Sequence, residues 1–188
     1  MEGSLVLKIL KTDTFTKRFK PRIYTLDTLP YHLIKNQIYI VHTSNSKTLP
    51  SKSGLIRGHF FVIDSLTSDG SCGYQLTLFD SYGRSLESLP YSRIRQIVKY
   101  NVKREKGFFA WNDVKLQTGQ STICAHLSIY YCLFKARGYN LETILKDKFS
   151  RYSSQNLFAV PAIVESYLPK QIRLARKEKI RLNLDLFS

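Results

Sequence analysis

The sequence has no long apolar run: no stretch approaches the roughly 18 residues of a membrane-spanning helix. It begins Met-Glu-Gly-Ser-Leu-Val-Leu-Lys, without the basic segment and small-residue cleavage site of a secretory signal peptide. Internal repeats and long linkers are also absent. We therefore expect a single domain over residues 1–188, neither secreted nor associated with a membrane.

Cysteine is scarce, with three residues in all, and an odd number leaves at least one thiol free. This argues against a disulfide scaffold and favours a reducing compartment. No group of Cys and His has the spacing of a zinc site, because Cys124 and His126 supply two ligands at most. We expect no metal, and no cofactor that the chemistry requires.

Acidic residues are also few, 14 against 29 Lys and Arg, which gives a formal net charge of +15. Such an excess favours binding of polyanions through counterion release, although a basic surface also serves solubility alone. No helix-turn-helix, RNP or zinc-finger pattern is present, so DNA binding is expected to be independent of sequence. The C-terminal segment, about residues 162–188, is predicted to be a basic surface helix, with a nucleic-acid grip or a docking segment as alternatives.

Apolar residues make up 43% of the chain and aromatic residues 13%, as in a globular protein with a proper core. Their patterns predict strands at 5–10, 37–42, 58–64, 74–83 and 108–111. Helices are predicted from residue 90, over 124–134, over 141–145 and from residue 160. We therefore predict an α+β fold in which a central mixed β-sheet packs against the helix that starts at Cys124, with Trp111 in the core.

The strongest chemical signal is Cys124, at the start of an apolar helix that Ser121 or Thr122 can cap and that ends near Gly138. Free N–H groups and the positive end of the helix dipole favour a thiolate in the first turn, and the thiolate is the nucleophile. A cysteine at a helix start is more often inert packing. His126 is a poor base for it, because residues two apart on a helix point to different sides.

Two predicted strands supply a histidine and an acid. His59 opens the strand at 58–64 and Asp80 closes the strand at 74–83, so a hairpin would bring both to the same edge of the sheet. A carboxylate in that position orients an imidazole and stabilises its charged form. Asp64 is the alternative acid. Each residue alone also has an ordinary interpretation, as a histidine at a strand edge or an acid before a turn.

Gln117 lies seven positions before Cys124. Its side-chain amide, together with the backbone N–H of the nucleophile, would hold the oxyanion of a tetrahedral intermediate. Gln120 is the competing candidate, nearer in sequence and equally polar. Either residue is also interpretable as a solvated loop side chain.

Taken in order, His59, Asp80, Gln117 and Cys124 resemble the pattern of the adenovirus-type maturation proteases (adenain-like), a family that also occurs in virophages and Maverick/Polinton elements. The segments that carry the resemblance are GHFFVID at 58–64, LFDSYG at 78–83 and the interval 117–124, within residues 32–137. The resemblance implies a papain-like, adenain-type fold. It also implies His59 as general base, Asp80 as its orienting acid, Gln117 as oxyanion donor and Cys124 as nucleophile.

The resemblance further implies a cysteine endopeptidase that processes capsid or core precursor proteins during virion maturation. The expected location is the virion and the host cytoplasm, and DNA or a peptide is a candidate activator. Three features depart from the family. Ala125 replaces the usual Gly after the nucleophile, Phe60 replaces the common Trp, and residues 91–115 contain no cysteine for a disulfide-linked activating peptide.

Two other functions remain open from the sequence. A protease that removes ubiquitin- or SUMO-like modifiers shares the same order of His, Asp, Gln and Cys. A non-enzymatic, basic nucleic-acid-binding virion protein would instead keep Cys124 as a core residue. The first predicts a preference for a folded modifier, and the second predicts slow, buried thiol behaviour.

Overall fold

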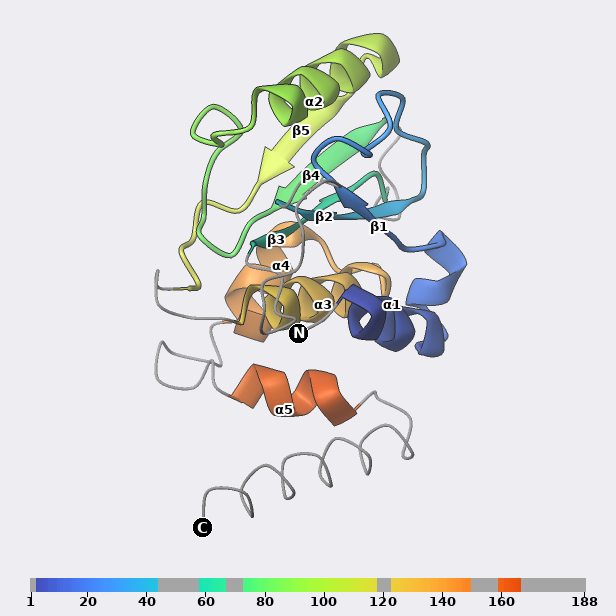
Figure 1. Cartoon of the computed structure of the whole chain (residues 1–188), viewed down its shortest axis with the longest axis vertical. Helices are drawn as coiled ribbons and strands as arrows, with labels where there is room; N and C mark the ends of the chain where they lie inside the picture. Colours follow the sequence, from blue (N-terminus) through green and yellow to red (C-terminus); the bar gives the residue numbers. More distant parts are fainter. Residues whose placement is uncertain (1–2, 44–57, 67–72, 118–122, 150–158, 167–188) are drawn as a thin grey trace, which may run out of the picture.

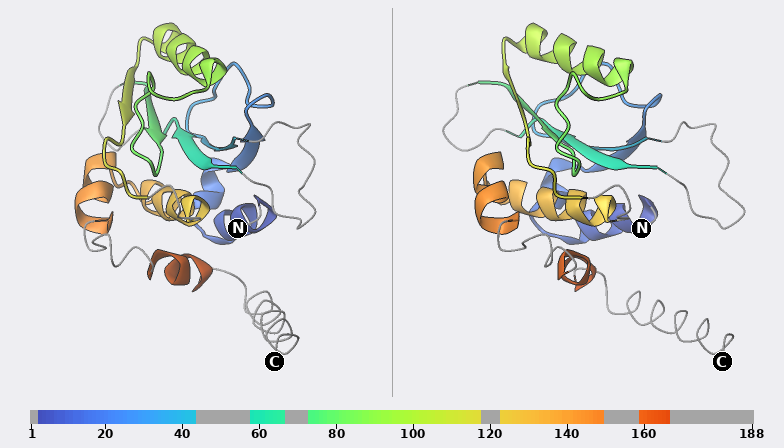
Figure 2. Two further views of the ribbon diagram at one scale, coloured as in Figure 1. Left: turned by 60° about the vertical axis from the view of Figure 1, so that its left-hand side comes forward. Right: turned by 90° about the vertical axis from the view of Figure 1, so that its left-hand side faces the viewer.

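A computed structural model describes residues 3–43, 58–66, 73–117, 123–149 and 159–166. A five-stranded mixed sheet in the order β1-β2-β3-β4-β5 forms the central layer, with helices on both faces (Figures 1 and 2). The strands are β1 (Arg22–Thr25), β2 (Ile38–His42), β3 (Phe60–Asp64), β4 (Gln75–Phe79) and β5 (Phe108–Trp111). The β2–β3 and β3–β4 pairs are antiparallel, whereas the edge strands β1 and β5 are parallel to their neighbours β2 and β4. The predicted α+β class with a mixed sheet is confirmed.

Helix α2 covers one face of the sheet, and α1 and α3 cover the other (Figure 1). The helical elements are α1 (Gly3–Thr12), η1 (Thr16–Phe19), α2 (Ser92–Glu105), α3 (Cys124–Lys135), α4 (Leu141–Thr143), η2 (Ile144–Phe149, a π-helix) and α5 (Ala159–Ser166). None of the helices in the described ranges is both long and apolar enough to cross a membrane.

The central strands are buried on both faces, which explains why they are nearly continuous apolar runs. In β3, Phe60 and Val62 belong to the hydrophobic cluster that contains α3. Phe61 and Ile63 belong to the cluster on the opposite face, with α2. Burial of alternate residues on each side therefore fixes the register of the strand that follows His59.

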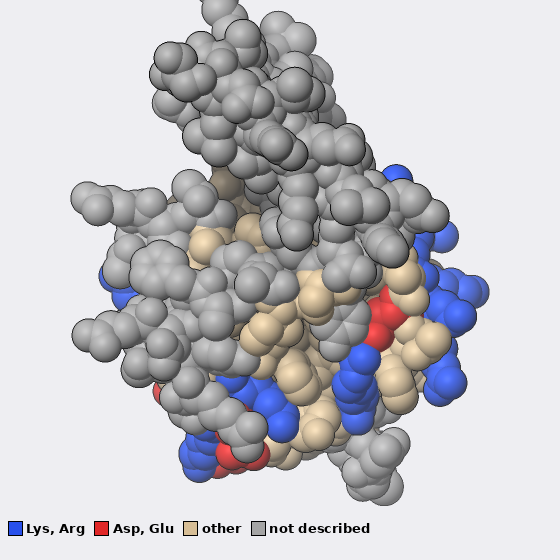
Figure 3. Space-filling view, turned by 90° about the horizontal axis from the view of Figure 1, so that it is seen from below, with Lys and Arg blue, Asp and Glu red and all other residues tan. Residues whose placement is uncertain are grey.

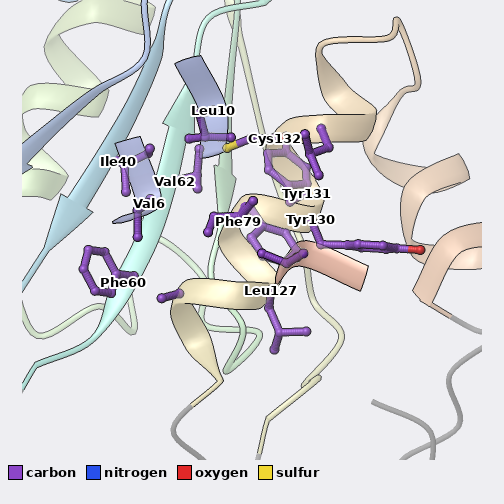
Figure 4. Packing of buried hydrophobic residues seen from close by; sticks show 14 of the residues in the cluster. Val6, Leu10, Ile40, Phe60, Val62, Phe79, Leu127, Tyr130, Tyr131 and Cys132 are labelled. Carbon is purple, nitrogen blue, oxygen red and sulfur yellow. The ribbon is translucent and has the colours of Figure 1, made fainter. Parts of the chain in front are cut away.

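Helix α3 is the most deeply buried helical element that the structure describes, and α1 and α5 contribute residues to the same core cluster (Figure 4). The ring of Tyr131 stacks on that of Phe79 in β4, with centroids 4.4 Å apart and an interplanar angle of 6°. Phe79 also stacks on Phe149, at 5.6 Å. This aromatic packing fixes the helix that carries Cys124 against the sheet.

Two sequence-based expectations are wrong. The predicted strand at 5–10 is helix α1, in which Val6, Ile9 and Leu10 share the helical spacing of one buried face and pack in the cluster with α3. Trp111 is not a core residue: it is 43% exposed on the edge strand β5, where its ring stacks on Phe109. Because β5 has a neighbour on one side only, its aromatic side chains reach the surface.

The strands predicted at 37–42, 58–64 and 108–111 are confirmed, as are the helices after residue 90 and at 124–134. The strand predicted at 74–83 is found as Gln75–Phe79 and ends before Asp80. The short helix predicted at 141–145 is found as α4 and the start of η2. Other predictions lie outside the described residues: the Ser121 or Thr122 cap, Gln120, and all but the first part of the basic C-terminal segment.

Candidate active site

His59 and Asp80 meet at one end of the β3–β4 hairpin, as the sequence predicted. His59 lies just before β3 and Asp80 just after β4, and His59 Nε2 is 2.6 Å from Asp80 Oδ1. The backbone of His59 is fixed by Thr43, whose hydroxyl accepts from the His59 N–H at 2.8 Å. The His59 carbonyl accepts in turn from the Thr43 N–H at 2.9 Å. Both the ring and the backbone of His59 are therefore held in place.

The Asp80 carboxylate is fully buried and accepts hydrogen bonds at both oxygens. Besides His59, Oδ1 accepts from the Tyr82 N–H at 3.1 Å, and Oδ2 accepts from Arg84 Nε at 2.5 Å. Burial alone would raise the pKa of Asp80, but the hydrogen bonds from His59 and Arg84 outweigh it and leave the pKa below its usual value. Asp80 is therefore ionised around neutral pH.

The amide of Asn112 holds the backbone of Asp80. Its Oδ1 accepts from the Asp80 N–H at 2.7 Å, and its Nδ2 donates to the Asp80 carbonyl, also at 2.7 Å. Asn112 is fully buried and directly follows β5, so a neighbouring strand sets the position of the acid. These side-chain bonds lie just beyond the last paired residues of the two strands, Leu78 and Trp111.

The thiol of Cys124 lies beside the ring of His59, at the first residue of α3. Burial opposes the thiolate, but the interaction with His59 and the backbone N–H groups of Phe60 and Ala125 outweigh it and lower the pKa of Cys124. Burial likewise opposes the imidazolium of His59, yet Asp80 and Cys124 raise the pKa of His59. A raised imidazole pKa and a lowered thiol pKa together favour a thiolate–imidazolium pair.

The second ring nitrogen of His59 is oriented away from Asp80. Nδ1 is buried and makes no hydrogen bond of normal geometry within the described residues. Because Nε2 is engaged by the carboxylate, Nδ1 is the atom left to exchange a proton with the Cys124 thiol. Cys124 is 7% exposed, so a small part of its surface is open to solvent.

Gln117 is buried, at 4% exposure, and is not the solvated loop residue that its sequence context also allowed. Its Oε1 accepts from the Ser81 hydroxyl at 2.7 Å, and its Nε2 donates to the Tyr82 hydroxyl at 3.3 Å. The structure therefore brings Gln117 to the turn that follows Asp80. Residues 118–122, between Gln117 and the nucleophile helix, lie outside the described residues.

The turn after Asp80 is joined to the segment that carries Gln117. The N–H groups of Leu116 and Gln117 both donate to the Ser81 carbonyl, at 2.9 and 3.0 Å. Gly83 has a φ of +68° and lies so close to the backbone of Val114 that a Cβ would come within 2.8 Å of it. Only glycine fits both the backbone angle and the contact. The turn that follows Asp80 and the segment that carries Gln117 are thus held together by backbone contacts.

Asp64, the alternative acid, does not join this group. It ends β3 at the opposite end of the strand from His59. Its Oδ2 accepts from the Tyr131 hydroxyl at 2.5 Å, and Lys135 Nζ lies 3.9 Å from Oδ1. Asp64 therefore belongs to a separate buried cluster at the other end of the hairpin.

Sequence reasoning did not identify Arg84, Asn112 or Tyr82 as parts of the site. The ring of Tyr82 lies 4.6 Å from that of His59 between centroids. The sequence does contain a local indication of the Arg84 contact, because Arg84 follows Asp80 by four residues across a glycine turn. Asn112 had none, because its contact with Asp80 spans 32 positions.

Ala125, which departs from the family pattern, is buried, and its methyl group belongs to the core cluster around α3. Of the cysteines in the described ranges, Cys124 and Cys132 are both free thiols. Within the same ranges, no group of three or more His, Cys, Asp or Glu side chains is arranged to hold a metal ion.

No protein-family model and no curated protein matches the chain. Among solved structures, the chain is similar to two crystal structures of the ASFV pS273R protease, one of them the selenomethionine protein. The TM-scores are 0.40 and 0.37 at 13% identity, and each likeness covers 58% of this chain. The chain matches only 38% and 37% of the protease's own length. Likeness at this level does not fix an activity, which depends on the geometry around Cys124.

Proposed function

We propose that this protein is a cysteine endopeptidase with Cys124 as nucleophile, His59 as general base and Asp80 as the acid that orients it. The observation that carries the proposal is the 2.6 Å contact between His59 Nε2 and a buried, ionised Asp80, beside a cysteine of lowered pKa. A fully buried structural thiol would have a raised pKa instead. A Cys–His–Asp arrangement of this kind is the one needed for acyl transfer.

The proposed reaction begins when His59 Nδ1 takes the proton of the Cys124 thiol. The thiolate then attacks the carbonyl carbon of a peptide bond, and the oxyanion is stabilised by the Gln117 amide and the Cys124 N–H. Protonated His59 gives its proton to the leaving amine, and a thioester remains. Water, deprotonated by His59, hydrolyses the thioester and restores the thiol. Asp80 keeps the imidazole in the required tautomer throughout.

The substrates proposed from the sequence resemblance are capsid or core precursor proteins, cut during virion maturation in the virion and the host cytoplasm. The rival, a protease for ubiquitin- or SUMO-like modifiers, has the same chemistry. The two are separated by comparing kcat/KM for capsid-precursor peptides with that for a modifier-linked reporter. A preference for the folded modifier would replace the maturation role with deconjugation.

We also propose that the protein binds polyanions, with DNA as the candidate partner and activator. This is supported by a cavity of about 620 Å³ whose lining includes Arg18, Lys20, Arg22 and Lys35 but no acidic residue. Lys35 pairs with Glu105 at 3.0 Å, whereas no described residue forms an ion pair with the other three. Seen from below, the molecule also carries Lys and Arg along its sides and few acidic groups (Figure 3).

A labelled oligonucleotide titrated at several salt concentrations tests the polyanion proposal. We expect affinity to fall steeply with salt, and the double variant Arg18→Gln/Arg22→Gln to reduce the slope of log K against log salt by about one to two units. Lys146→Gln/Lys148→Gln is the matched control, because it removes the same two charges from η2, which does not line the cavity. An equal loss in the control would assign binding to net charge and not to the cavity.

The protease proposal is tested with a peptidyl vinyl sulfone ending in Gly, read by intact mass and peptide mapping. We expect rapid modification of Cys124 that spares Cys132 and is abolished by His59→Ala. Equal, slow labelling of all accessible thiols, in the presence and absence of DNA and capsid peptides, would favour the non-enzymatic alternative. Because Cys132 lies on the same helix, it reports on any general unfolding of α3.

A further inference from the structure

Arg84 lies on the side of Asp80 away from His59 and shares its carboxylate. His59 Nε2 contacts Oδ1 at 2.6 Å, and Arg84 Nε contacts Oδ2 at 2.5 Å. The carboxylate has no exposed surface, so in the intact protein its hydrogen bonds come from protein donors and not from bulk water. A buried acceptor that loses its partner carries the full cost of desolvation. Oδ2 therefore depends on Arg84.

The position of Arg84 is set by the same turn that positions His59. Its guanidinium carbon lies 5.0 Å from the centroid of the Tyr82 ring, and that ring also contacts the imidazole of His59. Gly83, which precedes Arg84, has a left-handed backbone conformation. Arg84 is 25% exposed along its side chain, so it reaches Asp80 from the surface. The Tyr82 ring thus links the base and the arginine, and the Tyr82 N–H donates to the acid.

We infer that Arg84 is a positioning residue, which holds Oδ2 of Asp80 so that Oδ1 stays aligned with His59. This inference rests on the proposed cysteine-protease function. Arg84 touches neither the nucleophile nor the substrate in the proposed reaction, and acts through Asp80. Without it, a buried carboxylate with one free oxygen would rotate or take up a proton, and would no longer fix the imidazole.

Two effects of Arg84 have opposite signs at His59, which makes the inference testable. If Arg84 acts only as a nearby positive charge, its removal raises the pKa of both His59 and Cys124. If Arg84 positions Asp80, its removal weakens the hold on the imidazole, so burial lowers the pKa of His59 while the pKa of Cys124 rises. The charged and titratable groups that face the pair are, by element, His42 on β2, Asp80 after β4, Tyr82 and Arg84 on the turn, and Cys124 on α3.

The experiment compares wild type with Arg84→Met, which keeps side-chain length but removes charge and donors, and Arg84→Lys, which keeps the charge and one donor group. Cys124 is titrated by its rate of alkylation with chloroacetamide, and His59 by NMR of its ring. For Arg84→Met we expect the pKa of Cys124 to rise and that of His59 to fall, each by about one unit, which is about a tenfold loss of thiolate on the acid side. Arg84→Lys should recover part of both shifts.

The control is Arg93→Met, which removes an arginine that donates to the carbonyls of Leu26 and Leu29, away from the site. Its titrations should match wild type. Unchanged titrations in Arg84→Met, or a rise in both pKa values, would overturn the positioning role. If wild-type Cys124 reacts no faster than Cys132, the proposed function itself fails and the inference fails with it. Unfolding midpoints of all variants identify any that do not fold, and Arg84→Lys then carries the test.

Discussion

The β3–β4 hairpin carries a fully buried aspartate at each end, and the pKa values of the two are shifted in opposite directions. Asp80 has a cationic or ring donor on each oxygen, and these lower its pKa. Asp64 accepts from the Tyr131 hydroxyl and the Leu66 N–H, while its nearest cation, Lys135, is 3.9 Å away. Burial then dominates and raises the pKa of Asp64. Burial alone therefore does not indicate a functional acid; the donors around it decide.

The two free cysteines of α3 show the same contrast, eight residues apart on one helix. Cys124 is 7% exposed, and its pKa is lowered by His59 despite burial. Cys132 has no exposed surface, and burial together with Asp64 raises its pKa well above the usual value. Each end of the hairpin thus combines an acid with a cysteine, but only the His59 end favours both ionised forms.

The largest effect that would test this contrast is expected from Asp80→Asn. The amide would hold the imidazole in the wrong tautomer, and we expect kcat to fall by about ten-thousandfold on a peptide substrate. Asp64→Asn is the matched control, with the same chemical change at the other end of the hairpin and turnover per folded molecule near that of wild type. Near-normal turnover in Asp80→Asn, or a comparable loss in Asp64→Asn, would remove the functional difference between the two acids.

A smaller effect is expected from Gln117→Ala, which separates the oxyanion donor from the groups that support the thiolate. Loss of an oxyanion donor should lower kcat by about a hundred- to a thousandfold. Alkylation of Cys124 by chloroacetamide forms no oxyanion, so its rate should stay close to that of wild type. Gln120→Ala is the control, and a larger loss there would transfer the oxyanion role to Gln120. A loss of alkylation in Gln117→Ala would show that Gln117 supports the thiolate instead.

The smallest effect concerns stability at the Asp64 end. Asp64→Asn replaces one of the two oxygens that accept from the Tyr131 hydroxyl and the Leu66 N–H, so one buried donor loses its acceptor. We expect the free energy of unfolding to fall by about 2 kcal/mol near pH 4, measured with urea.

Because the pKa of Asp64 is raised, the folded state binds more protons than the unfolded chain above about pH 4. Wild-type stability from this group therefore decreases as pH rises from the unfolded pKa through the folded one. The difference between wild type and Asp64→Asn should shrink over that range. A difference that grows with pH would show that Asp64 is an ionised partner of Lys135.

The elements that carry the hairpin contrast were the easiest to predict from sequence. Strands β3 and β4 and helix α3 are dense apolar runs bounded by turns, so both their type and their adjacency follow from pattern. The apolar run at 5–10 cannot be assigned from sequence, because a short run fits a strand or a helix equally and only its packing against α3 decides. The exposure of Trp111 is not predictable either, because aromatic character does not reveal that β5 is an edge strand.

The residues that support the candidate site are harder to predict from sequence than His59 and Asp80 themselves. His59 and Asp80 follow from the hairpin, since each lies at the end of a strand. The amide of Asn112 reaches the Asp80 backbone only because β5 pairs with β4 across a long insertion that contains α2. Such a contact leaves no periodic or local signal in the sequence. The side chain of Gln117 is likewise buried only because its segment packs against the turn at Ser81.

The close contact between Gly83 and the backbone of Val114 has a consequence for how such a protein can diverge. Backbone hydrogen bonds and this contact hold the turn after Asp80 against the segment that carries Gln117. The spacing between the two side chains is therefore set by these contacts. Changes elsewhere in the chain therefore need not alter the spacing between the proposed acid and the proposed oxyanion donor. A methyl group added at Gly83 would come within 2.8 Å of the Val114 backbone, and it would force the turn after Asp80 away from the segment that carries Gln117.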